Sequence, residues 1–237
     1  MGTMVTASRM KPDSVDRVAE IFAEFDGTEI PAAIGLVRRQ LFIYNDIQVH
    51  VYDFEDDADE SALATVKLDP RMGQLAADLS PYVTPLNSET WSSPADSSAS
   101  VFYKWLGSLG ASPAAMHSTI IVARLAAEDI STVEGLFSEF DRTTELPERM
   151  GTRRRQLFSL DGLYFHVQDF DDHRGGSRIE DAKSDPRFVR ISQDLNPYIK
   201  VFDPDTWRSP SDAMATRFYH WSATTPSITE TELLNDI

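Results

Sequence analysis

The sequence of 237 residues predicts an α+β fold that is built twice in one chain. Three observations lead to this prediction. The second half of the sequence repeats the first at a spacing of 116 residues, as from His50 to His166. In each copy, segments rich in β-branched and aromatic residues are typical of strands. Between these segments, apolar residues recur at the spacing of a helix that is buried on one side.

The repeat indicates a duplicated domain. The motifs "DPR", "PY" and "TW.SP.D" occur once in each copy, and the copies close with "VFYKW" and "RFYHW". A unit of this length is too long for a solenoid repeat and is typical of a small domain. We therefore predict one domain at residues 1–106 and a second at 117–222. Residues 107–116 are predicted to link them, and 223–237 to form a flexible tail.

The elements of the second copy are predicted in chain order. The β-branched segment 117–125 reads as a strand, and 129–141 as a helix with one apolar stripe. Residues 152–160 and 163–171 read as two strands, because the Asp161-Gly162 pair between them favours a two-residue type I′ turn.

A second helix and a closing strand complete the copy. Asp185 is a candidate N-cap with a proline at the first helical position, which predicts a helix within 185–198. Residues 216–221 read as the last strand. The resulting order, βαββαβ, is that of a ferredoxin-like domain, so the chain is predicted to hold two such domains in tandem.

The hairpin loop predicts which side chains meet. With Asp161-Gly162 as the loop, His166 lies opposite Leu157, and Arg155 is its diagonal neighbour on the same face, about 7–8 Å away along the backbone. The same face carries Arg153, Tyr164 and Gln168, a mixture that suits a ligand cavity.

The first copy repeats this hairpin around the Asn45-Asp46 loop, which pairs Arg39 diagonally with His50. Arg38 and Arg154 point to the opposite face and are predicted to be surface charges. An interface arginine and a structural strand histidine also explain each Arg–His pair, and this alternative stays open.

Composition excludes several classes of function. The net charge of −16 argues against a nucleic-acid or membrane partner. The chain has no cysteine, so disulfides and thiolate metal sites are excluded. The histidines show no metal-ligand spacing. No apolar segment approaches a membrane span or the core of a signal peptide, so a cytoplasmic location is expected.

The motif D-x-T-x-E-L-P…RR-x-LF…LY-x-H, together with "DPRF", "NPYI" and "RFYHW", closely resembles the tetracenomycin cyclase family of aromatic polyketide cyclases. The resemblance implies single ferredoxin-like domains that pair as dimers, so this chain would be a fused pseudo-dimer similar to a dimeric α/β barrel. It also implies cofactor-free aldol cyclisation and dehydration of a poly-β-ketone intermediate in type II antibiotic biosynthesis.

The resemblance also implies which residues are catalytic: Asp141, Arg155 and His166 in the second copy, and Asp26, Arg39 and His50 in the first. Tyr164, Arg153 and Gln168 are candidates for binding substrate. One departure is Phe25 and Phe140, at positions where members often carry histidine. The first copy departs further, because it has Gln48 and Val37 where the second has Tyr164 and Arg153. We therefore expect the second copy to carry most of the catalysis.

Two other functions remain as alternatives. One is a cofactor-independent monooxygenase that oxidises a phenolic polyketide to a quinone. The other is a non-catalytic chaperone that binds polyketides for partner cyclases. The expected partner is a small polyketide intermediate, with an acyl carrier protein or partner cyclases as further candidates, and the chain is expected to be monomeric.

Overall fold

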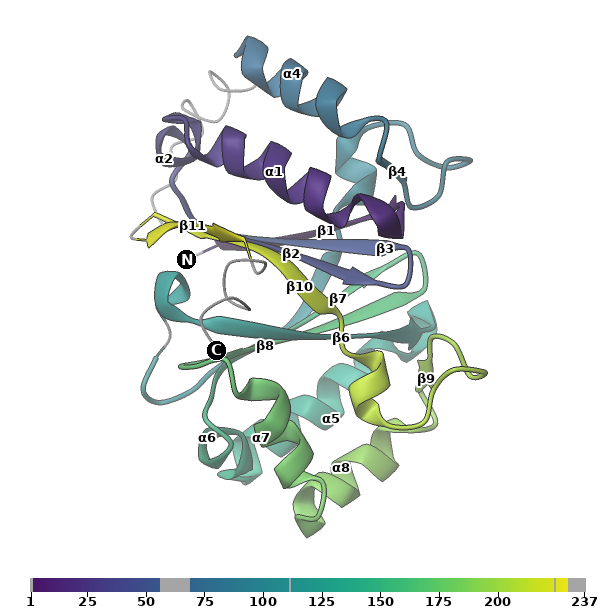
Figure 1. Cartoon of the computed structure of the whole chain (residues 1–237). Helices are drawn as coiled ribbons and strands as arrows, with labels where there is room; N and C mark the ends of the chain where they lie inside the picture. Colours follow the sequence, from purple (N-terminus) through teal and green to yellow (C-terminus); the bar gives the residue numbers. More distant parts are fainter. Residues whose placement is uncertain (1, 56–68, 111, 224, 230–237) are drawn as a thin grey trace. The chain divides into compact units, whose positions relative to one another are not determined.

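The structure is a computed structural model that describes residues 2–55, 69–110, 112–223 and 225–229 (Figure 1). The chain forms two compact units. Unit 1 comprises residues 1–98 and 216–237, and unit 2 comprises residues 99–215. Within the described residues, no helix combines the length and the apolar character needed to cross a membrane.

Unit 1 contains a six-stranded sheet in the order β11-β10-β2-β3-β1-β4. Its helices cover one face of this sheet (Figure 1). The strands are β1 (Gly2–Met10), β2 (Leu36–Tyr44), β3 (Ile47–Phe54), β4 (Val83–Pro85), β10 (Thr216–Ser222) and β11 (Thr225–Thr229). The helices are α1 (Val15–Asp26), α2 (Ile30–Ala33) and α4 (Pro70–Leu79).

Unit 2 contains a five-stranded sheet in the order β5-β7-β8-β6-β9, again with its helices on one face. The strands are β5 (Ser100–Leu106), β6 (His117–Leu125), β7 (Thr152–Leu160), β8 (Leu163–Phe170) and β9 (Ile199–Val201). The helices are α5 (Ile130–Thr143), α6 (Leu146–Arg149), α7 (Gly175–Ala182) and α8 (Pro186–Leu195). Both units show the α+β, ferredoxin-like arrangement predicted from the sequence.

The closing strand of each copy belongs to the sheet of the other copy. Strand β5, which ends the first copy, pairs with β7 of unit 2, and β10, which ends the second copy, pairs with β2 of unit 1. The prediction that residues 216–221 close the sheet of their own copy is therefore wrong. The fourth ferredoxin-like strand is instead the short β4 or β9, directly after the second helix.

The predicted hairpins are confirmed. Asp161 and Gly162 both have positive φ, 49° and 76°, as a type I′ turn requires. Leu157 lies opposite His166, and Leu41 lies opposite His50. The side chain of Asp185 accepts a hydrogen bond from the Arg187 backbone N–H, which confirms the predicted N-cap of α8.

Arg38 and Arg154 are buried, and each forms an ion pair with an aspartate of the neighbouring strand. Arg38 Nη2 lies 2.6 Å from Asp53 Oδ2, and Arg154 Nε lies 2.6 Å from Asp169 Oδ2. The prediction that the two arginines are surface charges is wrong, because side chains on this face of each sheet are buried as well. A buried guanidinium needs such a partner, since desolvating an unpaired charge is costly.

Candidate functional site

The catalytic candidates of the second copy meet in unit 2. Asp141 comes from the last turn of α5, Arg155 from β7 and His166 from β8. The Asp141 Oδ1 atom accepts a hydrogen bond from Arg155 Nη1, and all three side chains are buried. The Arg155 Cζ atom lies 5.0 Å from the centre of the Phe137 ring, and this ring meets the His166 ring edge-on at 5.1 Å. The aromatic ring and the carboxylate thus hold the guanidinium in place.

A tyrosine from the exchanged strand completes this group. The Tyr103 hydroxyl, on β5, donates a hydrogen bond of 2.9 Å to Asp141 Oδ2. Each carboxylate oxygen of Asp141 therefore has one donor, Arg155 on Oδ1 and Tyr103 on Oδ2. Unit 1 repeats the contact, because the Tyr219 hydroxyl on β10 donates to Asp26 Oδ2 at 2.9 Å.

Sequence reasoning missed these tyrosines. The only signal was their shared position in "VFYKW" and "RFYHW", the two motifs that close the copies. Nothing in either motif states which sheet the strand joins, so no contact between Tyr103 and Asp141 follows from the sequence.

A cavity of about 460 Å³ opens beside the Asp141–Arg155 pair in unit 2. Its walls are mostly apolar and include Phe137, Phe140, Ile179, Ile191 and Trp207. Four polar side chains reach it from β7 and β8, namely Arg155, Tyr164, His166 and Gln168. An apolar cavity with a few convergent polar groups is the usual form of a small-molecule site.

Each of these four polar side chains has a buried polar atom without a hydrogen-bond partner. The atoms are Arg155 Nε, Tyr164 Oη, His166 Nε2 and Gln168 Oε1. Buried polar groups are nearly always hydrogen-bonded, because an unmade bond costs about 1–3 kcal/mol. Four such atoms around one cavity are therefore expected to bond to a ligand.

Burial sets the protonation states in unit 2. It lowers the pKa of His166 well below its usual value of 6.5, and the nearby Arg155 charge lowers it further. Burial also raises the pKa of the Tyr164 hydroxyl, so this group stays a donor. The buried imidazole is therefore uncharged at neutral pH.

Burial also raises the pKa of Asp141, although Arg155 and the hydrogen bond from Tyr103 oppose this shift. The Tyr103 hydroxyl has a raised pKa as well, because of burial and the adjacent carboxylate. Tyr103 therefore remains protonated and can donate to Asp141 across the neutral pH range.

The equivalent group in unit 1 is bonded differently. Arg39 donates from Nε to Asp26 Oδ1 at 3.0 Å, and its Nη1 lies 3.0 Å from His50 Nε2. A guanidinium has no acceptor, so His50 Nε2 must accept this hydrogen bond. In unit 1 the lone pair of the histidine is therefore occupied, whereas in unit 2 His166 Nε2 has no partner.

Tyr52 covers the Arg39–His50 pair. Its ring stacks on His50 with the ring centres 3.6 Å apart, and Arg39 Cζ lies 5.3 Å from the centre of the Tyr52 ring. The Thr6 side chain hydrogen-bonds the Tyr52 hydroxyl and so fixes the ring. Unit 2 has Gln168 at the place of Tyr52 and Ile121 at the place of Thr6.

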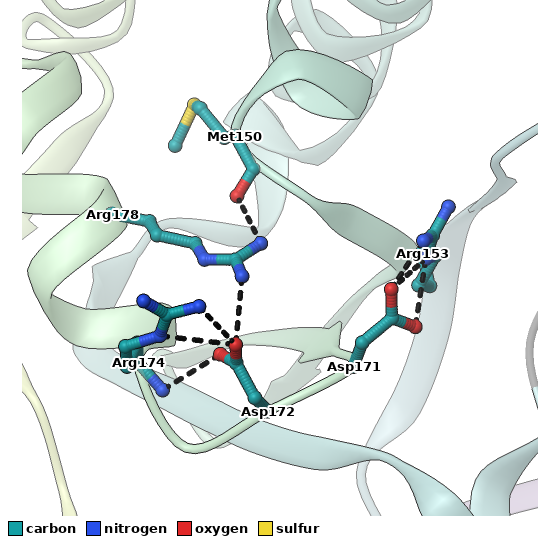
Figure 2. Close-up of polar contacts among 6 residues, drawn as sticks. All are labelled: Met150, Arg153, Asp171, Asp172, Arg174 and Arg178. Carbon is teal, nitrogen blue, oxygen red and sulfur yellow. Dashed lines mark hydrogen bonds and ion pairs between the residues drawn. The ribbon is translucent and has the colours of Figure 1, made fainter.

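Arg153 lies apart from the other candidates. The pairing of β7 with β8 shifts between Thr152 and Arg154, so alternation along the strand is broken at Arg153. Its guanidinium pairs with Asp171 (Figure 2). Arg153 is absent from the cavity lining, and the prediction that it shares a face with Arg155 is wrong.

Next to Arg153, a second polar cluster holds one wall of the cavity. Arg178 on α7 bonds Asp172 Oδ2 at 2.8 Å and the Met150 carbonyl oxygen at 3.3 Å (Figure 2). Met150 and Ile179 line the cavity, so Arg178 ties the end of α6 to α7. Gly151 has a φ of 81°, and a side chain there would collide with Arg178.

Comparison with known proteins finds two copies of one family in the chain. A family model described as polyketide synthesis cyclase matches residues 2–106 and again 117–222. Polyketide synthase CurG of Streptomyces cyaneus is 40% identical over 106 residues, which are 45% of this chain and 97% of that protein. Tetracenomycin F2 cyclase of Streptomyces glaucescens is 37% identical over 107 residues, which are 45% of this chain and 95% of that protein.

A solved structure supports the fold alone. The crystal structure of a putative monooxygenase from Fusobacterium nucleatum aligns with 96% of this chain and 96% of its own, with a TM-score of 0.56 and 11% sequence identity. Identity this low shows a shared architecture and carries no information on the reaction.

Proposed function

Because this chain belongs to the polyketide synthesis cyclase family, we propose that it closes a ring of a poly-β-ketone by aldol condensation in the cavity of unit 2. The chain is a polyketide cyclase of the type II class, in keeping with its similarity to tetracenomycin F2 cyclase. The observation that carries the choice of site is the set of four unpartnered buried atoms around the 460 Å³ cavity.

The first step is removal of a proton from a carbon between two carbonyl groups. His166 Nε2 is buried, uncharged and unpartnered, which supports it as the base. The electron pair of the C–H bond becomes an enolate. Arg155 Nε and the Tyr164 hydroxyl are the free donors that can bond the enolate oxygen.

The second step forms the carbon–carbon bond. The enolate carbon attacks a ketone carbon further along the chain, and the ketone oxygen becomes an alkoxide that takes up the proton held by His166. Loss of this oxygen as water, with a second proton from the neighbouring carbon, gives the conjugated ring. Gln168 Oε1 is an acceptor placed to orient an enol or hydroxyl group.

Asp141 and Tyr103 act through Arg155 in this proposal. The carboxylate holds Arg155 Nη1, and Tyr103 holds the carboxylate. The guanidinium is thus fixed before substrate arrives, which lowers the cost of reorganisation during the reaction. The apolar walls from Phe140, Ile179 and Trp207 would fold a flexible substrate into one reactive shape.

The partners and the oligomeric state follow from the same picture. The substrate is a small polyketide intermediate. We propose that a single chain is the working unit, since both sheets take a strand from the other copy of the same chain. The net charge of −16 favours a released substrate over one held by an acidic carrier protein.

The proposal is tested by product analysis with the purified chain. Tetracenomycin F2, which the Streptomyces glaucescens relative is named for, is the first substrate to try, followed by partially cyclised poly-β-ketones of other lengths. Loss of water without oxygen consumption is the expected result. Oxygen uptake with quinone formation would favour a monooxygenase, and binding without turnover would favour a chaperone.

A further inference from the structure

Unit 1 contains a cavity of its own, of about 430 Å³. Aromatic rings from Phe22, His50, Tyr52 and Trp91 line it, together with hydroxyl and amide side chains such as Ser8 and Gln48. Among the described residues of this lining, there is no lysine, arginine, aspartate or glutamate. Arg39 is not part of the lining, and its Cζ atom lies 5.3 Å from the centre of the Tyr52 ring.

Two pairs of polar side chains in this cavity bond each other. The Ser8 hydroxyl bonds Gln48 Oε1 at 3.3 Å, and Thr6 bonds Tyr52. Within the described lining, no side chain has a buried polar atom without a partner. The described part of this lining therefore has no counterpart of the four unsatisfied atoms in the cavity of unit 2.

Trp91 gives the cavity a flat aromatic wall. It is 40% exposed, which is high for a tryptophan. Its Nε1 atom nevertheless donates a hydrogen bond of 3.2 Å to Ser97 Oγ, so the ring is held at the cavity rather than free in solvent. A fixed and partly exposed ring is suited to stacking against a planar ligand.

We propose that the cavity of unit 1 binds an uncharged, planar, hydroxylated aromatic molecule and does not transform it. The ligand is planar because Trp91 offers a fixed and partly exposed ring. It is uncharged because the described residues of the lining hold no counter-charge for a buried charge. Hydroxyl or carbonyl groups on its edge would bond to side chains such as Ser8, Thr84 and Ser97.

The inference that unit 1 does not transform its ligand rests on the proposed function of unit 2. There the free His166 Nε2 is the base, whereas His50 Nε2 accepts a hydrogen bond from Arg39 and lies under the Tyr52 ring. The same chain would then hold one site for reaction and one for binding.

Binding is tested with the full chain and 1,8-dihydroxyanthraquinone as the probe, by calorimetry and by quenching of tryptophan fluorescence. Two molecules per chain are expected. Trp91→Ala should weaken one site about three- to ten-fold, the effect expected for losing an aromatic stacking contact. Trp207→Ala, the matched variant in unit 2, should weaken the other site. Anthraquinone-2-sulfonate should bind to unit 1 at least ten-fold more weakly than the neutral probe.

The proposed binding site in unit 1 would be contradicted if only one probe molecule bound per chain, or if both tryptophan variants weakened the same site. Equal affinity of unit 1 for the sulfonate would overturn the uncharged ligand class. Thermal unfolding of each variant separates lost binding from lost folding, and Trp91→Phe, which keeps a ring, should retain most of the affinity.

Turnover by a His166→Ala chain tests the other half of the proposal. If that chain binds the probe in unit 1 and retains full cyclase activity, unit 1 is catalytic. The proposal that unit 1 only binds then fails, and so does the assignment of catalysis to unit 2. If the activity is lost but only one probe molecule binds to the wild-type chain, the proposed function stands and the binding site does not.

Discussion

The two units place the same aspartate, arginine and histidine in different states. In unit 2, Arg155 bonds only its carboxylate among the described side chains, and His166 Nε2 faces a cavity without a partner. In unit 1, Arg39 bridges its carboxylate and His50, and Tyr52 covers the pair. The catalytic residue types alone therefore do not define a site, because the side chains around them decide which lone pairs and protons are available.

The cause of the difference is an exchange of neighbours along one strand. Unit 2 has Tyr164 two residues before its histidine and Gln168 two residues after it, whereas unit 1 has Gln48 before and Tyr52 after. Both positions lie on the face of the histidine. Placing the aromatic ring after the histidine stacks it on His50 and brings its centre to 5.3 Å from Arg39 Cζ.

The largest effect is expected from the two histidines. His166→Ala should lower kcat about 10²-fold or more, which is typical for loss of a general acid–base. His50→Ala is the matched control and should change kcat less than about three-fold, because His50 Nε2 is already bonded. Steady-state kinetics of both variants check this, and equal losses would contradict the difference between the units.

Arg155→Ala should lower kcat about 10²-fold through loss of a donor to the developing oxyanion. Arg155→Lys should recover little, since an ammonium cannot hold Asp141 and a substrate oxygen in the same geometry. Arg153→Ala is the control, because this side chain pairs with Asp171 outside the cavity lining and should leave kcat nearly unchanged. A similar loss in both alanine variants would show that charge alone matters.

The pH dependence of kcat/KM is expected to differ from that of an enzyme whose catalytic histidine has an ordinary pKa. Burial and Arg155 lower the pKa of His166 well below 6.5, so the neutral base is present throughout the neutral range. The acidic limb of kcat/KM should therefore lie below pH 6.5. A limb centred at or above pH 6.5 would mean that the catalytic base is not this buried imidazole.

The same shift affects stability. The unfolded chain protonates its histidine near pH 6.5, whereas the folded chain resists protonation of His166 and His50. As pH falls below about 6.5, the unfolded state takes up more protons, so the free energy of unfolding should fall. His50→Gln and His166→Gln should each reduce this dependence, as measured by urea unfolding between pH 7 and pH 5.

A smaller effect is expected from Tyr103, which positions Asp141 without lining the cavity. Tyr103→Phe removes one hydrogen bond to the carboxylate and should lower kcat about three- to ten-fold with little change in KM, because one such bond is worth about 1 kcal/mol. The variant should also raise the pKa of Asp141, since the hydrogen bond from Tyr103 lowers it. An unchanged kcat would remove the exchanged strand from the mechanism.

The hairpins and the Arg–His pairs could be predicted from the sequence, because a two-residue loop fixes the register of a local contact. The exchange of β5 and β10 could not be predicted, since the two closing strands have similar sequences and neither sequence shows which sheet its strand joins. The burial of Arg38 and the bulge at Arg153 could not be predicted either, because both depend on packing beyond the hairpin itself.

The roles of Tyr52 and Gln168 could be predicted only in part. The sequence showed the substitutions around His50, and it predicted a less active first copy. It did not show that Arg39 turns to bond His50, because this depends on where the Tyr52 ring packs and on its hydrogen bond with Thr6.

If the neighbours of the histidine decide which unit reacts, transferring these neighbours from unit 2 to unit 1 should make unit 1 catalytic. The substitutions Thr6→Ile, Gln48→Tyr and Tyr52→Gln give unit 1 the residues of unit 2 and are made in a His166→Ala chain. We expect kcat to rise at least ten-fold above that of His166→Ala alone, and to fall back when His50→Ala is added. A folded chain with all three substitutions and no gain in kcat would contradict this expectation.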